Sequence, residues 1–299
     1  MICYSHPAYY VPLPEGHPFP IEKYPETLRV LLESSHADKL DVRMPLPVSW
    51  EEITLVHEES YLRAVESDGL SSYARNRLGL PHHPRFLERS LLDVGGTLAA
   101  ARTALEVGAA WNLGGGTHHA MPTEGLGFCV TNDVSTAVKV LLREEPDLQI
   151  LIIDTDAHQG NGNHFVLGDL PNVFTYSIHV GANYPAQKVP GDMDVSLDRY
   201  VEGADYLKSL SRSLRKLGSA FSPDLIFWVS GVDVHVKDRF GQMRLSTEDM
   251  CSRDGVVLEF LQSTGASWVG TMGGGYHLHT SQTPQLHAMT VENSIAWTE

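Results

Sequence analysis

Cysteine is scarce in this sequence. The 299 residues include only Cys3, Cys129 and Cys251, which lie far apart and form no CxxC pair. An odd number of isolated cysteines argues against a disulfide framework and against a zinc site built on thiolates. We therefore expect a reducing compartment and predict a cytoplasmic protein.

Long hydrophobic runs are also missing. No window approaches about 18 consecutive apolar residues, the length that a membrane-spanning helix requires. The first basic residue is Lys23, and several prolines precede it, so the opening segment lacks the pattern of a secretory signal peptide. The sequence therefore predicts no membrane span.

Basic residues are outnumbered by acidic ones. The chain has 22 Lys and Arg against 37 Asp and Glu, a formal net charge of -15 at pH 7. This charge argues against sequence-independent binding to nucleic acid or to an anionic membrane. An acidic field would favour a cationic substrate, but acidic surfaces also serve solubility, so the charge alone identifies no partner.

Helix and strand patterns alternate along the chain, without internal repeats or low-complexity segments. We predict a single domain over residues 1–299, because this length can bury one sizeable core. Five apolar runs are continuous rather than alternating, as is typical of parallel strands covered on both faces, so the predicted class is α/β with a mostly parallel central sheet. The predicted strands are 110–113, 149–154, 173–178, 225–230 and 267–272, and the predicted helices are 25–36, 90–108, 133–146, 202–218 and 246–265.

Each of the five predicted strands is followed by a turn rich in glycine, histidine or aspartate. In a parallel sheet these turns meet at the carboxyl edge, where α/β folds bind their ligands. The convergence predicts a ligand site at this edge. The turns read GGGTHH after 113, TDAHQGNGN after 154, HVGANYP after 178, GVDVH after 230 and GGGYH after 272.

The second of these turns carries a candidate metal site. Asp156 and His158 are separated by one residue at the end of an extended segment, so their side chains point to the same side. A catalytic zinc takes about three N or O ligands and keeps one position open, and Asp233 at the same edge is the best third ligand. The alternative for an isolated D-x-H is a loop carboxylate bonded to a structural histidine.

Two further turns supply side chains that could act on a bound substrate. The adjacent His118 and His119 follow three glycines and can serve as a base beside the metal. A second pair, His82 and His83, stands between prolines with no strand before it, and we interpret it as a surface or rim loop. Tyr276 could donate to a polarised carbonyl oxygen, and its alternative role is that of a core tyrosine.

Taken together, these segments resemble the histone deacetylase superfamily, the zinc-dependent acyl-amide hydrolases of the arginase-deacetylase fold. The chain is most similar to the class IV branch and its bacterial relatives. The resemblance implies a single-domain three-layer α/β/α fold with a mostly parallel central sheet. The matching segments, in family order, are EGHPFPIEKY, GLPHHPRFLERSLLDVGGTLAAA, NLGGGTHHA, GLGFCVTND, IIDTDAHQGNGN, VFTYSIH, PDLIFWVSGVD, DRFGQMRLS and GGGY.

The resemblance also implies two metal sites. Zinc would be held by Asp156, His158 and Asp233, although iron(II) or cobalt would fit the same ligands. A structural potassium ion would use Asp154, the Ser177 hydroxyl and the backbone carbonyls of Asp156 and His158. An arginase-like site with two manganese ions would need a second carboxylate two residues after Asp233, where this chain has a histidine.

The same resemblance assigns catalytic roles. His119 would be the general base and later the acid that protonates the leaving amine, and His118 would tune the site electrostatically. Asp154 would orient His118, and Asn161 would orient His119. Tyr276 would stabilise the tetrahedral oxyanion.

The implied substrate is an acylated lysine in a protein or peptide, or a small acylated amine such as an acetylpolyamine. Gly127, Phe128 and Tyr184 would line the tunnel for the acyl-lysine stem, and Gly274 would belong to the same substrate site. Tyr184 stands where relatives usually have phenylalanine, so this wall is more polar. The alternative outside the enzymes is a catalytically silent acyl-binding protein. The sequence predicts no particular oligomeric state.

Overall fold

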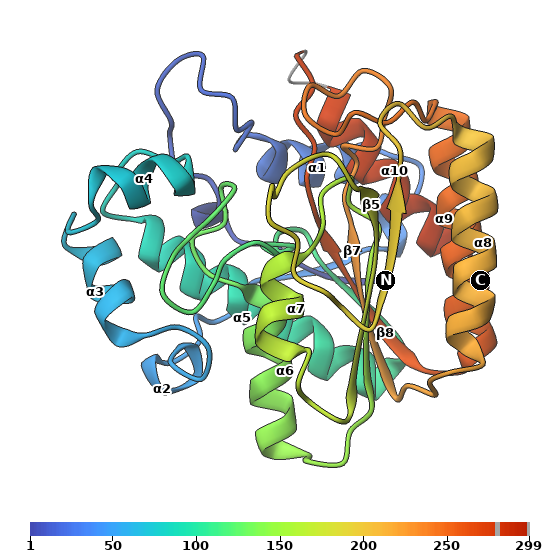
Figure 1. Cartoon of the computed structure of the whole chain (residues 1–299), viewed down its shortest axis with the longest axis horizontal. Coiled ribbons are helices and arrows are strands. Elements are labelled where there is room, and N and C mark those ends of the chain that lie inside the picture. Colours follow the sequence, from blue (N-terminus) through green and yellow to red (C-terminus); the bar gives the residue numbers. More distant parts are fainter. Residues whose placement is uncertain (279–281, 298–299) are drawn as a thin grey trace.

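The centre of the molecule is a parallel β-sheet (Figure 1). The computed structural model describes residues 1–278 and 282–297. The strands are β1 (Ile2–Tyr4), β2 (Asp41–Arg43), β3 (Ala109–Asn112), β4 (Ile150–Asp154), β5 (Val173–Val180), β6 (Met193–Leu197), β7 (Leu225–Ser230) and β8 (Ser267–Met272). They are arranged in the order β2-β1-β3-β8-β7-β4-β5-β6, and every neighbouring pair is parallel.

The five predicted strands are present as β3, β4, β5, β7 and β8, and they form the buried middle of the sheet. The remaining strands, β1, β2 and β6, lie at the two sides of the sheet and were not predicted. Both β1 and β2 have three residues, and none of the β2 residues is buried. The β6 strand alternates between intermediate and exposed residues. Strands without a continuous apolar run leave little signal in the sequence.

Helices cover both faces of the sheet and make three layers (Figure 1). The long helix α5 (Phe86–Val107), α6 (Asp133–Glu144) and α7 (Asn161–Leu167) lie on one side. On the other side lie α1 (Lys23–Leu32), α8 (Gly203–Gly218), α9 (Thr247–Thr264) and α10 (Gln282–Trp297). Three short helices, α2 (Trp50–Ile53), α3 (Glu59–Glu66) and α4 (Ser72–Leu78), extend the α5 side, and η1 (Pro7–Tyr9) and η2 (Ala37–Lys39) are 3-10 turns. The three-layer α/β/α prediction is confirmed.

The five predicted helices are present with shifted ends. The first begins at Lys23 rather than Pro25, because a proline is tolerated in the first helical turn, where amide groups have no partner within the helix. A capping box begins α9: the Ser246 side chain accepts from the Asp249 amide, and the Asp249 side chain accepts from the Ser246 amide. Within the described residues, no helix is long and apolar enough to cross a bilayer.

Candidate metal centre and active site

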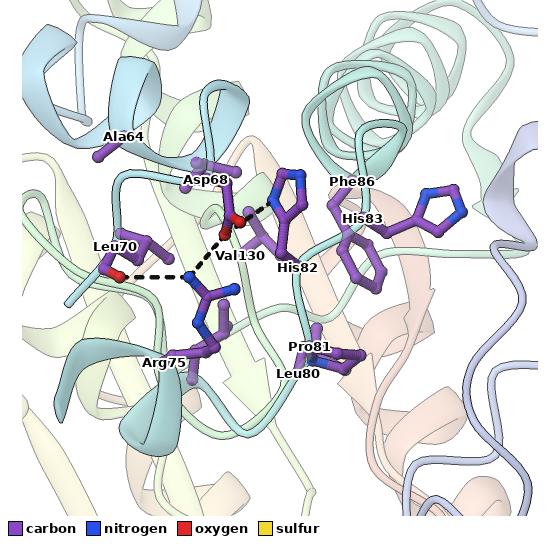
Figure 2. Close-up of a pocket in the computed structure, with 12 residues that line it drawn as sticks. Ala64, Asp68, Leu70, Arg75, Leu80, Pro81, His82, His83, Phe86 and Val130 are labelled. Atoms are coloured by element: carbon purple, nitrogen blue, oxygen red, sulfur yellow. Dashed lines mark hydrogen bonds and ion pairs between the residues drawn. The ribbon is translucent and has the colours of Figure 1, made fainter. Parts of the chain in front are cut away.

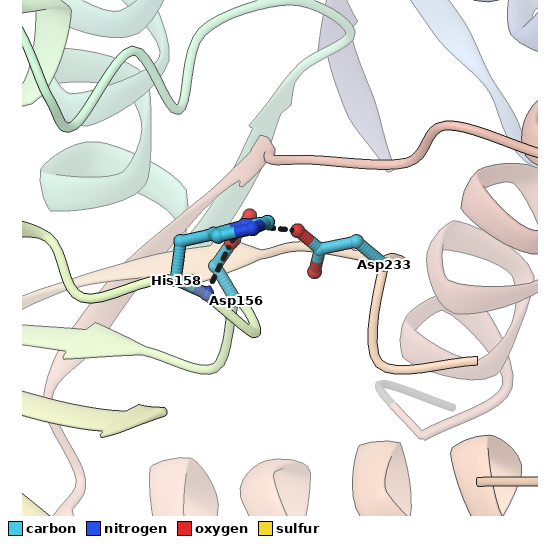
Figure 3. A group of neighbouring side chains, drawn as sticks. All are labelled: Asp156, His158 and Asp233. Atoms are coloured by element: carbon cyan, nitrogen blue, oxygen red, sulfur yellow. Dashed lines mark hydrogen bonds and ion pairs between the residues drawn. The ribbon is translucent and has the colours of Figure 1, made fainter. Parts of the chain in front are cut away.

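A group of three buried side chains lies at the carboxyl edge of the sheet (Figure 3). Asp156 and His158 follow β4, and Asp233 follows β7, which is hydrogen-bonded to β4. One ligand atom from each residue lies within 4.8 Å of the others. His158 Nδ1 is 2.8 Å from Asp233 Oδ2 and 3.1 Å from Asp156 Oδ1. The structure therefore brings the three predicted ligands together.

The chemistry of this group fits a divalent cation. Two buried carboxylates and one imidazole are the N and O donors that a catalytic zinc takes. Backbone amides orient the two carboxylates: Gly274 N–H donates to Asp156 at 2.6 Å, and Ala157 N–H donates to Asp233 at 2.9 Å. The ligands are thus fixed in place by the surrounding backbone.

The pKa values of His158 and Asp233 are also consistent with a bound cation. Burial favours the neutral form of His158, but hydrogen bonds to both carboxylates outweigh it and raise the His158 pKa well above its usual value. Burial and the charge of Asp156 raise the pKa of Asp233 to about 7. Two carboxylates so close together need a positive charge between or beside them, which protons or a metal ion supply.

His118 and His119 each lie within hydrogen-bond distance of the residue expected to orient them. His118 Nδ1 lies 2.6 Å from Asp154 Oδ2, and His119 Nδ1 lies 2.7 Å from Asn161 Oδ1. The amide oxygen of Asn161 only accepts hydrogen bonds, so His119 carries its proton on Nδ1 and leaves Nε2 free to accept another. The two imidazole rings lie with their centroids 4.1 Å apart.

The two neighbouring imidazoles titrate in opposite directions. Burial lowers the pKa of His118, but the charges of Asp154 and Asp156 outweigh it and raise that pKa to about 9. Burial and the positive charges of His118 and His158 lower the pKa of His119 well below its usual value. At neutral pH the site therefore pairs a charged His118 with a neutral His119.

A buried carboxylate holds the turn that delivers these histidines. Asp133 accepts from the Thr117 amide at 2.7 Å, the Thr117 hydroxyl at 2.6 Å and the Gly116 amide at 3.1 Å. Gly116 has a φ of +70°, and a side chain there would collide with the backbone carbonyl of Met272. This position therefore requires glycine.

Tyr276 lies on the turn after β8 and faces the same space. Its amide donates to Asp238 at 2.6 Å, and its ring centroid lies 5.2 Å from that of Phe240 and 5.7 Å from that of Phe128. Burial and the nearby carboxylates raise its pKa well above the usual value, so the hydroxyl keeps its proton and can donate it.

Lys23 lies buried behind this turn. Its ammonium group donates to the Gly273 carbonyl at 2.6 Å and lies 5.8 Å from the ring centroid of Tyr276. Burial lowers its pKa to about 8, opposed by the charges of Asp156 and Asp233. This lysine fixes the glycine turn from inside the protein.

A cavity of about 320 Å³ opens onto these groups. The expected tunnel residues Gly127, Phe128 and Tyr184 line it together with His119, His158 and Tyr276. Gly127 adopts a φ of +53° and Phe128 a φ of +68°. Tyr184 is 38% exposed, so its ring stands at the side of the cavity nearer to solvent.

Gly274 lines a smaller cavity of about 20 Å³ together with Gly127, Phe128 and Tyr276. It does not line the 320 Å³ cavity, and its N–H donates to the Asp156 carboxylate. Its backbone therefore contacts a candidate metal ligand.

The two side chains expected at a potassium site also lie together. Asp154 in β4 stands directly opposite Ser177 in β5, and both are buried. The Ser177 hydroxyl lies 2.9 Å from His179 Nδ1, and Asp154 Oδ1 accepts from the Asp156 amide at 3.0 Å.

The second histidine pair lies in a separate place (Figure 2). His82 approaches Asp68 at 3.5 Å, and Arg75 donates to the same carboxylate at 2.6 Å. The adjoining space has a volume of about 10 Å³, too little for a substrate. The structure gives His83 no contact with the candidate metal ligands in the described residues.

Four residues that shape the site were not assigned to it from the sequence. Asp133 was predicted only as a helix start, and Lys23, Asp93 and Asp238 were not singled out. Asp93 accepts from the Gly115 amide at 2.7 Å. The sequence carries one signal for a buried supporting role, the charged Asp93 inside the apolar helical segment LLDVGG.

Known proteins resemble this chain over most of its length. Residues 17–292 match the family model of the histone deacetylase domain. An uncharacterized protein from Picosynechococcus sp. is 38% identical over 271 residues, covering 91% of this chain and 90% of that protein. Acetoin utilization protein AcuC of Bacillus subtilis is 31% identical over 288 residues, covering 88% of this chain and 74% of that protein. Histone deacetylase 2 of Arabidopsis thaliana is 29% identical over 270 residues, covering 87% of this chain and 70% of that protein.

Solved structures share the fold. The crystal structure of an HDAC homolog from Aquifex aeolicus has a TM-score of 0.80 at 21% identity and covers 98% of this chain and 83% of that chain. The chain belongs to the histone deacetylase family. It is a hydrolase that acts on acetyl-amide bonds.

Proposed function

We propose that the protein is a zinc-dependent deacylase that hydrolyses the acyl-amide bond of acetyl-lysine or a longer acyl-lysine. Asp156, His158 and Asp233 would hold the ion, and iron(II) or cobalt would suit the same donors. When bound there, a divalent cation supplies Lewis-acid chemistry, polarising an acyl carbonyl and lowering the pKa of a water molecule. The observation that carries the proposal is that a single cavity gathers His119, His158 and Tyr276.

In the proposed reaction, His119 moves the protons. Its Nε2 accepts a proton from the attacking water, because the hydrogen bond to Asn161 keeps Nδ1 protonated and the low pKa keeps the ring neutral at the start. The same Nε2 then returns the proton to the leaving amine. The positive charge of His118, held by Asp154, opposes charging of His119 and so makes it a readier proton donor in this second step.

Tyr276 would stabilise the negative oxygen that develops on the acyl carbon. Its hydroxyl remains protonated at neutral pH, and a donor fixed before the reaction loses little in reorganisation. Gly127, Phe128 and Tyr184 would hold the stem that links the amide to the rest of the substrate.

Asp154 and Ser177 would hold a structural potassium ion with the backbone carbonyls of Asp156 and His158. Residues 1–299 would form one catalytic domain. A cytoplasmic location would suit a chain in which all three cysteines are free thiols.

The test is acyl release measured by mass spectrometry from lysine peptides carrying acetyl to myristoyl groups, and from acetylspermidine. Chelator-sensitive turnover that returns on adding zinc is expected, and the preferred chain length reports how deep the cavity is. Absence of turnover of every substrate by zinc-loaded protein would contradict the proposal and favour a silent acyl-binding protein.

A further inference from the structure

The mouth of the active-site cavity is basic, although the protein as a whole is acidic. Apart from the histidines near the metal group, the charged side chains lining it are Arg77 and Arg239, and the polar ones include Asn76, Asn183 and Gln242. No aspartate or glutamate occurs among the described residues that line it. The charged side chains of this cavity lining are therefore basic within a chain of net charge -15, and the acidic Glu58 and Glu124 line the adjoining cavity.

Of the two arginines, Arg77 is paired with a carboxylate of the described residues and Arg239 is not. Arg77 forms an ion pair with Glu124 at 3.1 Å. Arg239 lies over the ring of Phe240, 5.0 Å from its centroid, and makes no ion pair with a carboxylate within the described part of the chain. Its guanidinium is exposed to solvent beside the cavity and free to pair with an anionic ligand.

The backbone around Arg239 is held firmly relative to the reacting groups. The buried Asp238 carboxylate accepts from the Phe240 amide at 2.8 Å and from the Tyr276 amide at 2.6 Å. The Asn183 side chain donates to the Phe240 carbonyl at 2.7 Å. One carboxylate therefore fixes both the turn that carries Arg239 and the turn that carries Tyr276.

We propose that the acylated amine cleaved here carries a carboxylate on its amine half, and that Arg239 pairs with this carboxylate at the mouth. This inference rests on the proposed function. The scissile amide must reach His119 and Tyr276 inside the cavity, so the amine half of the substrate remains beside the exposed arginines. Guanidinium groups form strong charge-assisted hydrogen bonds with carboxylates and repel ammonium groups. Acetylated polyamines are therefore poor substrates.

The carboxylate can come from two sources that share this chemistry. It is either the free α-carboxylate of an acyl-lysine amino acid or an acidic side chain next to the acyl-lysine in a polypeptide. Two substrate pairs distinguish them: Nα-capped acetyl-lysine as free acid or as carboxamide, and an acetyl-lysine peptide with Glu or with Gln beside the lysine. Within each pair only one charge changes.

The measured quantity is the ratio of kcat/KM for the charged member of each pair to that for the neutral member. At low salt we expect a ratio of about 5 in at least one pair, the upper end for a solvent-accessible ion pair, falling as salt is added. In Arg239→Gln this ratio falls to about 1, and in Arg239→Glu it drops below 1, because the sign of the local charge is reversed. Arg212→Gln, an exposed arginine on α8, is the matched control and keeps the wild-type ratio.

The outcomes separate this inference from the proposed function. Turnover with a ratio near 1 in both pairs, or faster cleavage of acetylspermidine than of the free acid, overturns the carboxylate preference and leaves the deacylase intact. An Arg212→Gln ratio that falls as far as that of Arg239→Gln assigns the effect to overall charge and overturns the role of Arg239. Absence of turnover of every substrate overturns both.

Discussion

The Tyr276 amide donates a 2.6 Å hydrogen bond to the Asp238 carboxylate, which also accepts from Phe240 at 2.8 Å and Gly241 at 3.0 Å. A buried carboxylate with three amide donors ties two loops together at the edge of the sheet. The position of the Tyr276 hydroxyl therefore depends on a residue that does not touch the substrate.

We expect Asp238→Ala to lower kcat by about 100-fold, since small displacements of a catalytic group have effects of this size. The three amides contact both carboxylate oxygens and Asp238→Asn keeps only one accepting oxygen, so this variant should also lose activity, though less than Asp238→Ala. Bound metal, measured by mass spectrometry, should stay at the wild-type level in both variants. Wild-type kcat in Asp238→Ala would contradict the positioning role of this carboxylate.

Tyr276→Phe removes the hydroxyl and keeps the ring. We expect kcat to fall by about 100- to 1000-fold, the usual effect of deleting a donor to a developing oxyanion. Metal content should remain at the wild-type level, because the hydroxyl is not one of the proposed ligands. Wild-type turnover by this variant would remove Tyr276 from the mechanism.

His119→Ala should reduce kcat by about 100- to 10,000-fold, the range for loss of a general base. His83→Ala is the matched control, because His83 is also half of a histidine pair but lies away from the proposed metal ligands. The measurement is the steady-state kcat of both variants. Equal losses would show that the proton-transfer role was assigned to the wrong pair.

Much of the fold could be predicted because the inner strands are continuous apolar runs. The missed strands β1 and β2 have three residues each, too few for a reliable pattern, and β6 contains no buried residue. Pairing with neighbours, which the sequence does not display, makes these segments strands.

The grouping of three candidate ligands could be predicted, because Asp156 and His158 are two residues apart and Asp233 follows another strand. The supporting residues could not, since Asp238 reaches Tyr276 across 38 residues and Lys23 reaches Gly273 across 250. Contacts over such separations depend on how the helices pack onto the sheet. Nothing in the local sequence distinguishes these residues from surface ones.

His57 gives the protein a dependence of stability on pH. It is buried, lies 3.1 Å from the Met121 carbonyl, and accepts from the Asn132 amide at 2.8 Å. Burial lowers its pKa from 6.5 to about 4. As the pH falls, the unfolded chain binds a proton first, so the stability is complete above about pH 6.5 and is lost as pH falls towards 4.

This histidine alone should lower the free energy of unfolding by about 3 kcal/mol between pH 6.5 and pH 4. His57→Gln keeps a donor and an acceptor but does not titrate, so its stability should fall less over the same range. Urea unfolding at several pH values measures the difference. Parallel curves for the two proteins would contradict a buried neutral His57.

The central claim is that Asp156, His158 and Asp233 hold one catalytic divalent ion. The most direct measurement is metal content by mass spectrometry together with acyl release, for wild type and Asp233→Ala purified side by side. We predict about one zinc, iron or cobalt ion per wild-type chain, with both metal and turnover lost in the variant. Full turnover by metal-free wild type, or wild-type metal content and turnover in Asp233→Ala, would contradict the claim.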